Sequence, residues 1–338
     1  MRSVDGQGTA NAGGVAASGL QRGSTRTPRE RLPDFLIIGA MKAGTTTLYR
    51  DLMTHPRVYF PLDKEPNNLC DDAVLTDHGR AAYAAHFRRA RPDQLCAEAS
   101  TAYTKIPVYT GAAERARRLL GPGLRAIYLV RDPVARIVSQ HHHELTVGRL
   151  EVIPDINEAV RRTPRYLDYS RYAMQVRPWI EAFGAMNVRI VPFEQYVRDR
   201  RGRVAELERF LGLDPRPDLV EAERVFNAAD SKPGRTGRLA WLTHSGVYRT
   251  LVRPFVGQEL RDRVRRALHG RPPPRPAPPT PETVEFIVDS LRDEMRAISA
   301  LAGADGGLLW DESEIRAKHA ARAGVPGPCD DRGAEEGG

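Results

Sequence analysis

Short apolar runs alternate along the chain with longer stretches of helical periodicity. The apolar runs are Phe35–Ile38, Leu95–Ala97, Ala126–Val130 and Val188–Val191, with a shorter extended piece at Val58–Phe60. This alternation is typical of parallel strands joined by crossover helices. The pattern therefore predicts an α/β protein in which helices flank a central parallel sheet.

The stretches between the apolar runs carry helix signals. Pro133 suits the first turn of a helix and Gly148 its exit, while Gly121 and Pro122 mark a helix end. We therefore predict helices at Thr45–His55, Ala112–Leu120, Pro133–Val147, Tyr172–Phe183, Arg203–Leu211 and Glu282–Leu301.

The two ends of the chain and one internal segment show neither period. Residues 1–31 are rich in Gly, Ala, Ser, Thr and Arg, and residues 316–338 mix Ala, Gly, Pro and charges, so both are predicted to be flexible tails. Seven prolines within 271–281 predict an extended connector before the last helix. One folded domain is expected over 32–315, which is long enough to bury a full core.

The charge balance is mildly basic. The chain has 51 Lys plus Arg against 43 Asp plus Glu, a net charge of +8, and the basic residues are scattered. Such a balance suits an anionic ligand but lacks the clustered basic stripe of a nucleic-acid binder. We therefore expect a small-molecule or glycan partner and no nucleic acid.

The cysteines favour a reducing compartment, and the apolar runs are too short for a membrane span. Cys70, Cys96 and Cys329 lack metal-binding spacing, so free thiols are favoured, although the sequence leaves a Cys70–Cys96 bridge open. No run approaches the roughly 20 apolar residues needed to cross a bilayer, and no secretory leader is recognisable. We expect a cytoplasmic protein, and the high Ala, Arg and Gly content is compatible with a bacterial source.

The turn between the first strand and the first helix has the composition of a phosphate-binding loop. Gly39 and Gly44 allow the backbone to curl so that N–H groups converge on an anion, and the new helix points its positive end there. A nucleoside triphosphatase loop places its lysine directly after the second glycine, whereas Thr45 occupies that position here and Lys42 lies between the glycines. The cofactor-binding candidates in this loop are Lys42, Ala43, Gly44, Thr45, Thr46 and Thr47.

The displaced lysine gives the loop a family resemblance. The run GAMKAGTTTLY resembles the 5′-phosphosulfate loop of bacterial and carbohydrate-type sulfotransferases, which use 3′-phosphoadenosine 5′-phosphosulfate (PAPS). The resemblance implies a P-loop-like three-layer fold. It also implies sulfuryl transfer without a metal, because Lys42, the loop amides and Arg131 would carry the anionic charge.

A second motif follows the strand Ala126–Val130. An arginine at the carboxyl end of a central strand and a serine two turns into the next helix can meet one phosphate from two sides. The segment resembles the family's 3′-phosphate motif RxPxxRxxS, with Arg131 and Ser139 at the phosphate-contacting positions. Arg136 is interpreted as a structural salt-bridge residue. His141–His143 point in three directions on a helix, so we expect no metal site there.

A late basic loop gives further cofactor candidates. The run Asn227–Arg238 resembles the family's cofactor-covering loop, which makes Lys232, Gly234 and Arg235 candidates for the 3′-phosphate. A solvated basic loop is the alternative interpretation.

The general base must lie opposite the leaving phosphate oxygen. Lys42 can stabilise that oxygen, and Glu65 is the predicted base because the segment Lys64–Pro66 resembles the KEP run of carbohydrate-type sulfotransferases. An exposed Lys64–Glu65 pair in a loop is the alternative, with His55 and His86 as fallback bases. The substrate-side candidates are Lys64, Glu98, His143 and Tyr172.

Two other functions remain open at this stage. A small kinase with an unusual loop would use Asp132 as a metal-binding carboxylate, and a noncatalytic nucleotide-binding module would need no base. The KEP-like turn favours a carbohydrate, glycolipid or hydroxylated natural product as acceptor. The sequence fixes neither the acceptor, nor O- against N-sulfation, nor the oligomeric state.

Overall fold

A buried strand, β1 (Phe35–Gly39), lies at the centre of the sheet. Phe35 to Ile38 are at most 1% exposed, and each such side chain contributes about 1.5–3 kcal/mol on burial. This run of apolar residues is what a strand covered on both faces requires. The chain is seen in a computed structural model that describes residues 30–62, 64–147, 151–223, 276–303 and 307–323.

The sheet is parallel, with strand order β2-β3-β1-β4-β5. The other strands are β2 (Val58–Tyr59), β3 (Leu95–Ala99), β4 (Arg125–Val130) and β5 (Val188–Pro192). In the register, Phe35 pairs with Ala97 on one side and with Arg125 on the other. All five strands therefore deliver their carboxyl ends to one edge of the sheet.

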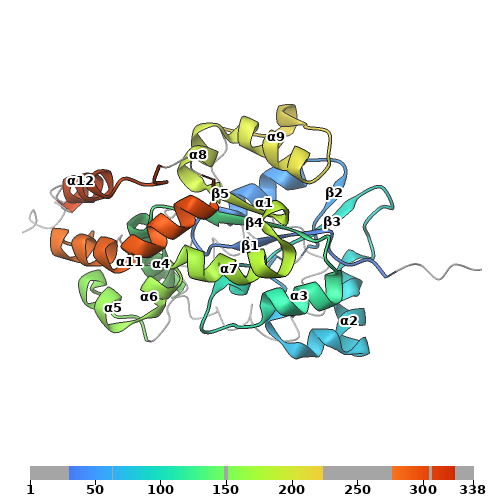
Figure 1. Cartoon of the computed structure of the whole chain (residues 1–338), viewed down its shortest axis with the longest axis horizontal. Coiled ribbons are helices and arrows are strands. Elements are labelled where there is room, and N and C mark those ends of the chain that lie inside the picture. Colours follow the sequence, from blue (N-terminus) through green and yellow to red (C-terminus); the bar gives the residue numbers. More distant parts are fainter. Residues whose placement is uncertain (1–29, 63, 148–150, 224–275, 304–306, 324–338) are drawn as a thin grey trace, which may run out of the picture. The chain divides into compact units, whose positions relative to one another are not determined.

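Helices cover both faces of the sheet. The helices are α1 (Thr45–Met53), α2 (Asp77–Ala84), α3 (Ala112–Leu120), α4 (Pro133–Val147), α5 (Ile156–Arg162), α6 (Arg165–Asp168), α7 (Tyr172–Phe183), α8 (Phe193–Arg198), α9 (Arg200–Phe210), α11 (Pro281–Leu301) and α12 (Glu312–Ala323). Figure 1 shows α1 and α9 on one face and α3 and α7 on the other. The predicted three-layer α/β fold is confirmed.

Helix boundaries differ from the predictions mainly at the ends. The helices predicted at Ala112–Leu120, Pro133–Val147 and Tyr172–Phe183 have the predicted bounds. Helix α9 begins three residues earlier than predicted, at Arg200, because the side chain of Asp199 accepts the Gly202 N–H and caps it.

The C-terminal part differs from the sequence interpretation. Helix α12 runs through the predicted boundary at residue 315 and ends at Ala323, so the expected tail 316–338 begins inside a helix. Ile315 and His319 are buried, one turn apart on the same side of α12. Because only this narrow side is buried, the segment lacks the broad apolar stripe from which a helix is usually predicted.

The structure can be compared with the sequence predictions about the cysteines and about membrane-spanning helices. Cys70 and Cys96 are free thiols, and burial raises the pKa of each to about 11. Within the described ranges, no helix is both long and apolar enough to cross a bilayer. The cytoplasmic location stays a prediction.

A buried ion pair fixes helix α1, and with it the loop that precedes the helix. Arg200 of α9 donates two hydrogen bonds to Asp51 of α1, at 2.6 and 2.7 Å, and the Tyr196 hydroxyl donates a third. Asp51 is 1% exposed and Arg200 7%, so water screens the pair little. The pair ties the first helix to the layer that covers it.

We predict that Asp51→Ala lowers the free energy of unfolding by about 3–5 kcal/mol, because it leaves the Arg200 guanidinium buried without its carboxylate. Urea unfolding followed by circular dichroism measures this value. Asp93→Ala is the control: it breaks an exposed pair with Arg91 and should cost less than about 1 kcal/mol. Equal losses in the two variants would contradict the assignment of Asp51 as the anchor.

Candidate functional site

The loop after β1 is curled tightly by its backbone. Lys42 has φ 68° and Gly44 φ 97°, both in the left-handed region, and the Ala43 N–H donates to the Ala40 carbonyl at 3.2 Å. The loop is fastened to the next strand because the Ala40 N–H donates to the Leu129 carbonyl at 2.7 Å. Such alternation of backbone conformation forms an anion-binding concavity.

The start of helix α1 leaves donors at this concavity. Gly44 is the N-cap residue and offers no side-chain oxygen to the first-turn amides. The Thr47 N–H already donates to the Gly44 carbonyl, so the Thr45 and Thr46 N–H groups are the first-turn donors that can face an anion. A Cβ at Gly44 would lie 2.5 Å from the Phe193 ring, so only glycine fits there.

Arg131 joins the second predicted motif to the loop. Its Nη1 donates to the Lys42 carbonyl at 3.2 Å, and its guanidinium carbon lies 4.8 Å from the centre of the Phe193 ring. Since Phe193 also packs on Gly44, the arginine and the loop share one wall. The two halves of the predicted site therefore lie side by side at the carboxyl ends of β1 and β4.

The residues after Arg131 are held inside the fold. Asp132 is buried, its Oδ1 accepts the Ala135 N–H at the start of α4, and its Oδ2 lies 2.7 Å from Lys318 Nζ and 3.0 Å from His319 Nε2. Burial raises the pKa of Asp132, but His319 and Lys318 outweigh it and hold that pKa far below its usual range. The carboxylate that the kinase hypothesis assigns to a metal is thus engaged by two side chains of this chain, Lys318 and His319.

Arg136 differs from the salt-bridge residue that we expected. It is fully buried and donates to Ser170 Oγ, Gln140 Oε1 and the Tyr166 carbonyl, each at 2.7 Å. All three acceptors are neutral. Burial lowers the pKa of Arg136. Its hydrogen bonds connect α4 to the segment around α6.

Glu65 lies at the carboxyl end of the neighbouring strand β3. Its backbone N–H donates to the Ala99 carbonyl at 3.1 Å, and Ala99 pairs with Ile37 of β1. Its Oε1 accepts from Lys64 Nζ at 2.8 Å and from Thr101 Oγ1 at 3.4 Å. The predicted base therefore lies one strand away from the phosphate loop, with an exposed side chain.

Several residues at the predicted site have a strained backbone with positive φ. Within the described part of the chain, the non-glycine residues with positive φ are Lys42, Glu65 and Asn67. Each such residue costs about 1–3 kcal/mol and persists only where the surroundings impose it. Residue type gives no signal for this strain at Lys42 and Glu65, whereas Asn67 is of the type that adopts the left-handed region most readily after glycine.

Two substrate-side candidates are interior residues. Glu98 is fully buried and accepts hydrogen bonds from the hydroxyls of Tyr83 and Tyr103, and burial raises its pKa. Tyr172 is buried and its hydroxyl donates to the Arg131 carbonyl at 2.8 Å. The structure therefore places both away from an open acceptor surface, where they support the strands and Arg131.

The remaining candidates fall into two groups. Ser139 and His143 are partly exposed residues of α4. The predictions for Lys232, Gly234 and Arg235 lie outside the described residues. Residues near the candidate site that the sequence analysis missed are Thr101, Phe193, Glu194, Lys318 and His319. The first three lie one or two residues after a strand end, which is the signal that could have found them.

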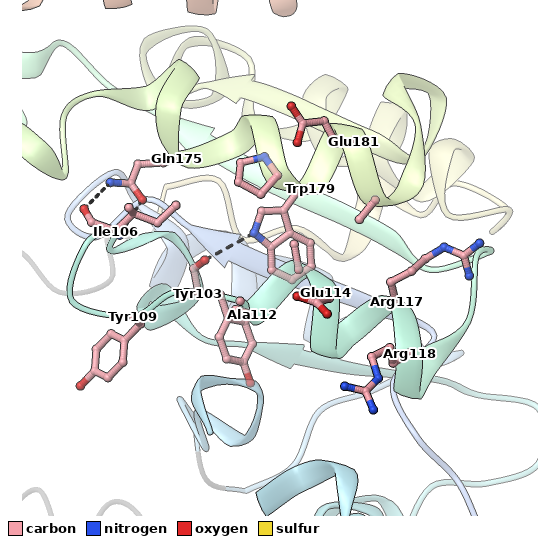
Figure 2. Close-up of a pocket in the computed structure, with 14 residues that line it drawn as sticks. Tyr103, Ile106, Tyr109, Ala112, Glu114, Arg117, Arg118, Gln175, Trp179 and Glu181 are labelled. Atoms are coloured by element: carbon pink, nitrogen blue, oxygen red, sulfur yellow. Dashed lines mark hydrogen bonds between the residues drawn. The ribbon is translucent and has the colours of Figure 1, made fainter. Parts of the chain in front are cut away.

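A cavity of about 450 Å³ is lined mainly by α3 and α7 (Figure 2). Trp179 lies in its wall and donates to the Tyr103 carbonyl at 3.4 Å, while Arg117 and Arg118 project from α3. None of the predicted cofactor residues lines this cavity. We therefore do not assign it to the phosphate site.

Comparison with known proteins assigns the family. Residues 32–232 match the family model described as "Sulfotransferase domain". The chain is 29% identical over 215 residues to heparan sulfate glucosamine 3-O-sulfotransferase 6 of Mus musculus, covering 61% of this chain and 59% of that protein. The Homo sapiens protein of the same name is 28% identical over 246 residues, covering 67% of this chain and 68% of that protein.

A solved structure agrees with the fold. The sulfotransferase from Alicyclobacillus acidocaldarius superposes with a TM-score of 0.55 at 22% identity, covering 85% of this chain and 99% of that chain. The fold and the loop define an α/β protein with a glycine-bearing strand-to-helix turn after β1. The chain belongs to the family of PAPS-dependent sulfotransferases, as the sequence predicted, and it spans about three fifths of the mouse relative.

We predict that Gly44→Ala destabilises the protein and abolishes binding of adenosine 3′,5′-bisphosphate, because the new methyl group would overlap the Phe193 ring. Gly121→Ala is the matched control: Gly121 also has a positive φ, of 83°, but no atom lies within 4 Å of a Cβ there. The control should lose about 1–3 kcal/mol of stability and keep its nucleotide affinity. Unfolding and calorimetry measure both; normal binding by Gly44→Ala would contradict the loop assignment.

Proposed function

We propose that this protein transfers a sulfuryl group from PAPS to a hydroxyl or amine of a carbohydrate, glycolipid or natural-product acceptor. The observation that carries the proposal is the hydrogen bond from Arg131 Nη1 to the Lys42 carbonyl, which puts the two predicted phosphate motifs at one sheet edge. The family match at residues 32–232 supports the same reaction. A phosphoryl-transfer role has no such support.

The donor site follows from the loop and Arg131. The Thr45 and Thr46 amides and the Lys42 ammonium would hold the 5′-phosphosulfate, while Arg131 and Ser139 would hold the 3′-phosphate. Gly44 suits a phosphate-binding loop because it has no Cβ. The Phe193 ring can therefore pack directly against the loop backbone. Lys232, Gly234 and Arg235 are proposed to complete the 3′-phosphate site.

The acceptor side is proposed to use Glu65. Partial burial of the Glu65 side chain raises its pKa. The Lys64 and Lys105 cations, with hydrogen bonds from Lys64 and Thr101, lower the pKa by more, so it lies below its usual value. Glu65 is therefore a carboxylate at neutral pH and can accept a proton. Lys64, at 2.8 Å, fixes its direction.

Transfer then needs few groups. PAPS supplies an activated sulfur with a phosphate leaving group. As the acceptor oxygen or nitrogen bonds to sulfur and the bond from sulfur to the phosphate oxygen breaks, Glu65 takes the acceptor proton and Lys42 neutralises the charge on the departing oxygen. Both charges are thus met by residues at one sheet edge.

A basic hollow lined in part by the segment before Lys64 supports an anionic carbohydrate acceptor. A cavity of about 390 Å³ is lined by Tyr59, Pro61, Leu62, Ala85, His86, Arg88 and Arg89. It lies at the carboxyl end of β2, directly before Lys64. Two arginines beside an aromatic ring suit an acidic sugar, and the names of the mouse and human relatives point to the same class of acceptor.

Glu65→Gln tests the base. We predict a fall in kcat of about 10²–10⁴-fold, because the amide cannot take the acceptor proton. The affinity for adenosine 3′,5′-bisphosphate should stay unchanged. Glu98→Gln is the comparison variant, since a buried interior carboxylate should affect stability more than kcat per folded molecule. Full turnover in Glu65→Gln across several acceptors would eliminate Glu65 as the base and would require another residue to take the acceptor proton.

The pH profile of kcat/KM tests the charge environment of Glu65. A base with a lowered pKa stays active as the pH falls to its ordinary value of 4.5, so we predict no acid limb from Glu65 between pH 5 and 7. Lys64→Met removes the largest opposing cation, and the acid limb should move to higher pH. An unchanged profile in Lys64→Met would show that Lys64 does not act on the base.

A further inference from the structure

Two side chains of the C-terminal helix α12 form hydrogen bonds with Asp132, the residue directly after Arg131. Lys318 and His319 both approach Asp132 Oδ2, at 2.7 and 3.0 Å. Asp132 is 1% exposed and His319 3%, so their contact is shielded from water, whereas the Lys318 side chain is 43% exposed. Because Asp132 Oδ1 accepts the Ala135 N–H, the same carboxylate also fixes the start of α4.

A second contact from the C-terminal segment reaches the same turn. Trp310 Nε1 donates to Glu194 Oε2 at 3.0 Å, and Glu194 Oε1 accepts the Asp132 backbone N–H at 3.0 Å. The Trp310 ring lies 5.9 Å from that of Tyr172, whose hydroxyl donates to the Arg131 carbonyl at 2.8 Å. Both the carbonyl and the N–H of the Arg131–Asp132 peptide are therefore held by groups that Trp310 contacts.

This support comes from outside the part of the chain that defines the family. The family match ends at residue 232, whereas Trp310 and α12 lie beyond it. An arginine side chain is long, and its planar fork binds phosphate well only when its backbone is fixed. Without the Lys318 ammonium and the His319 ring nitrogen, Asp132 would be a buried carboxylate lacking compensation at Oδ2, and the turn would have to rearrange.

We propose that Lys318 and His319 are positioning residues for recognition of the 3′-phosphate: by fixing Asp132 they orient Arg131 toward an anion beside the phosphate loop. This inference rests on the proposed function. It assigns to α12 an effect on one phosphate of the nucleotide, which a purely structural helix would not have.

The test compares adenosine 3′,5′-bisphosphate with adenosine 5′-phosphate by calorimetry on the full chain. In the double variant Lys318→Met/His319→Leu, affinity for the bisphosphate should fall about tenfold or more, and affinity for the monophosphate less than about twofold. Lys318→Arg/His319→Gln retains an N–H donor at each position and should stay within about threefold of the parent. Glu314→Ala, an exposed change on the same helix, is the control.

Each outcome decides the question. Loss confined to the bisphosphate, with recovery in the conservative double variant, supports the proposal. An equal fall for both ligands, or an unchanged preference for the bisphosphate in a variant with a normal melting curve, overturns it. If the parent protein itself binds the two ligands equally, the proposed function fails first, because no 3′-phosphate site exists.

Discussion

The pairing of β1 with β4 is the constraint on which the site depends. Parallel strands send their carboxyl ends to one edge, so the loop after Gly39 and the turn at Arg131 must emerge together. The bond from the Ala40 N–H to the Leu129 carbonyl extends this pairing past the end of β1, and Arg131 then reaches the Lys42 carbonyl. Two motifs separated by about ninety residues of sequence thereby come to share one wall, where we propose that the anionic donor binds.

The two sides of this wall differ in packing and in exposure to solvent. On the donor side, Gly44 and Arg131 both pack on Phe193, and Asp51 with Arg200 holds the helix behind them. On the acceptor side, Glu65 is exposed and is held by its backbone and by Lys64. The proposed nucleotide site is therefore packed against neighbouring side chains, whereas the proposed base is open to solvent.

Sequence reasoning reached the elements whose signal is local. The buried strands, the glycine-bearing loop and an arginine at a strand end could be predicted because each depends on a few neighbouring residues. It could not reach partners that are distant in sequence. Glu98 was predicted to line the acceptor cleft, whereas Tyr83 and Tyr103 enclose it in the interior. Helix α12 lacks a broad apolar stripe because only a narrow side of it, with Ile315 and His319, is buried. The left-handed backbone at Lys42 and Glu65 likewise leaves no trace in residue type.

The most direct test of this account is a crystal structure of the protein with adenosine 3′,5′-bisphosphate. The account predicts the 5′-phosphate within hydrogen-bonding distance of the Thr45 and Thr46 amides and the 3′-phosphate on the guanidinium of Arg131. A nucleotide that contacts only one of these two groups, or that binds in the cavity beside Trp179, would contradict it.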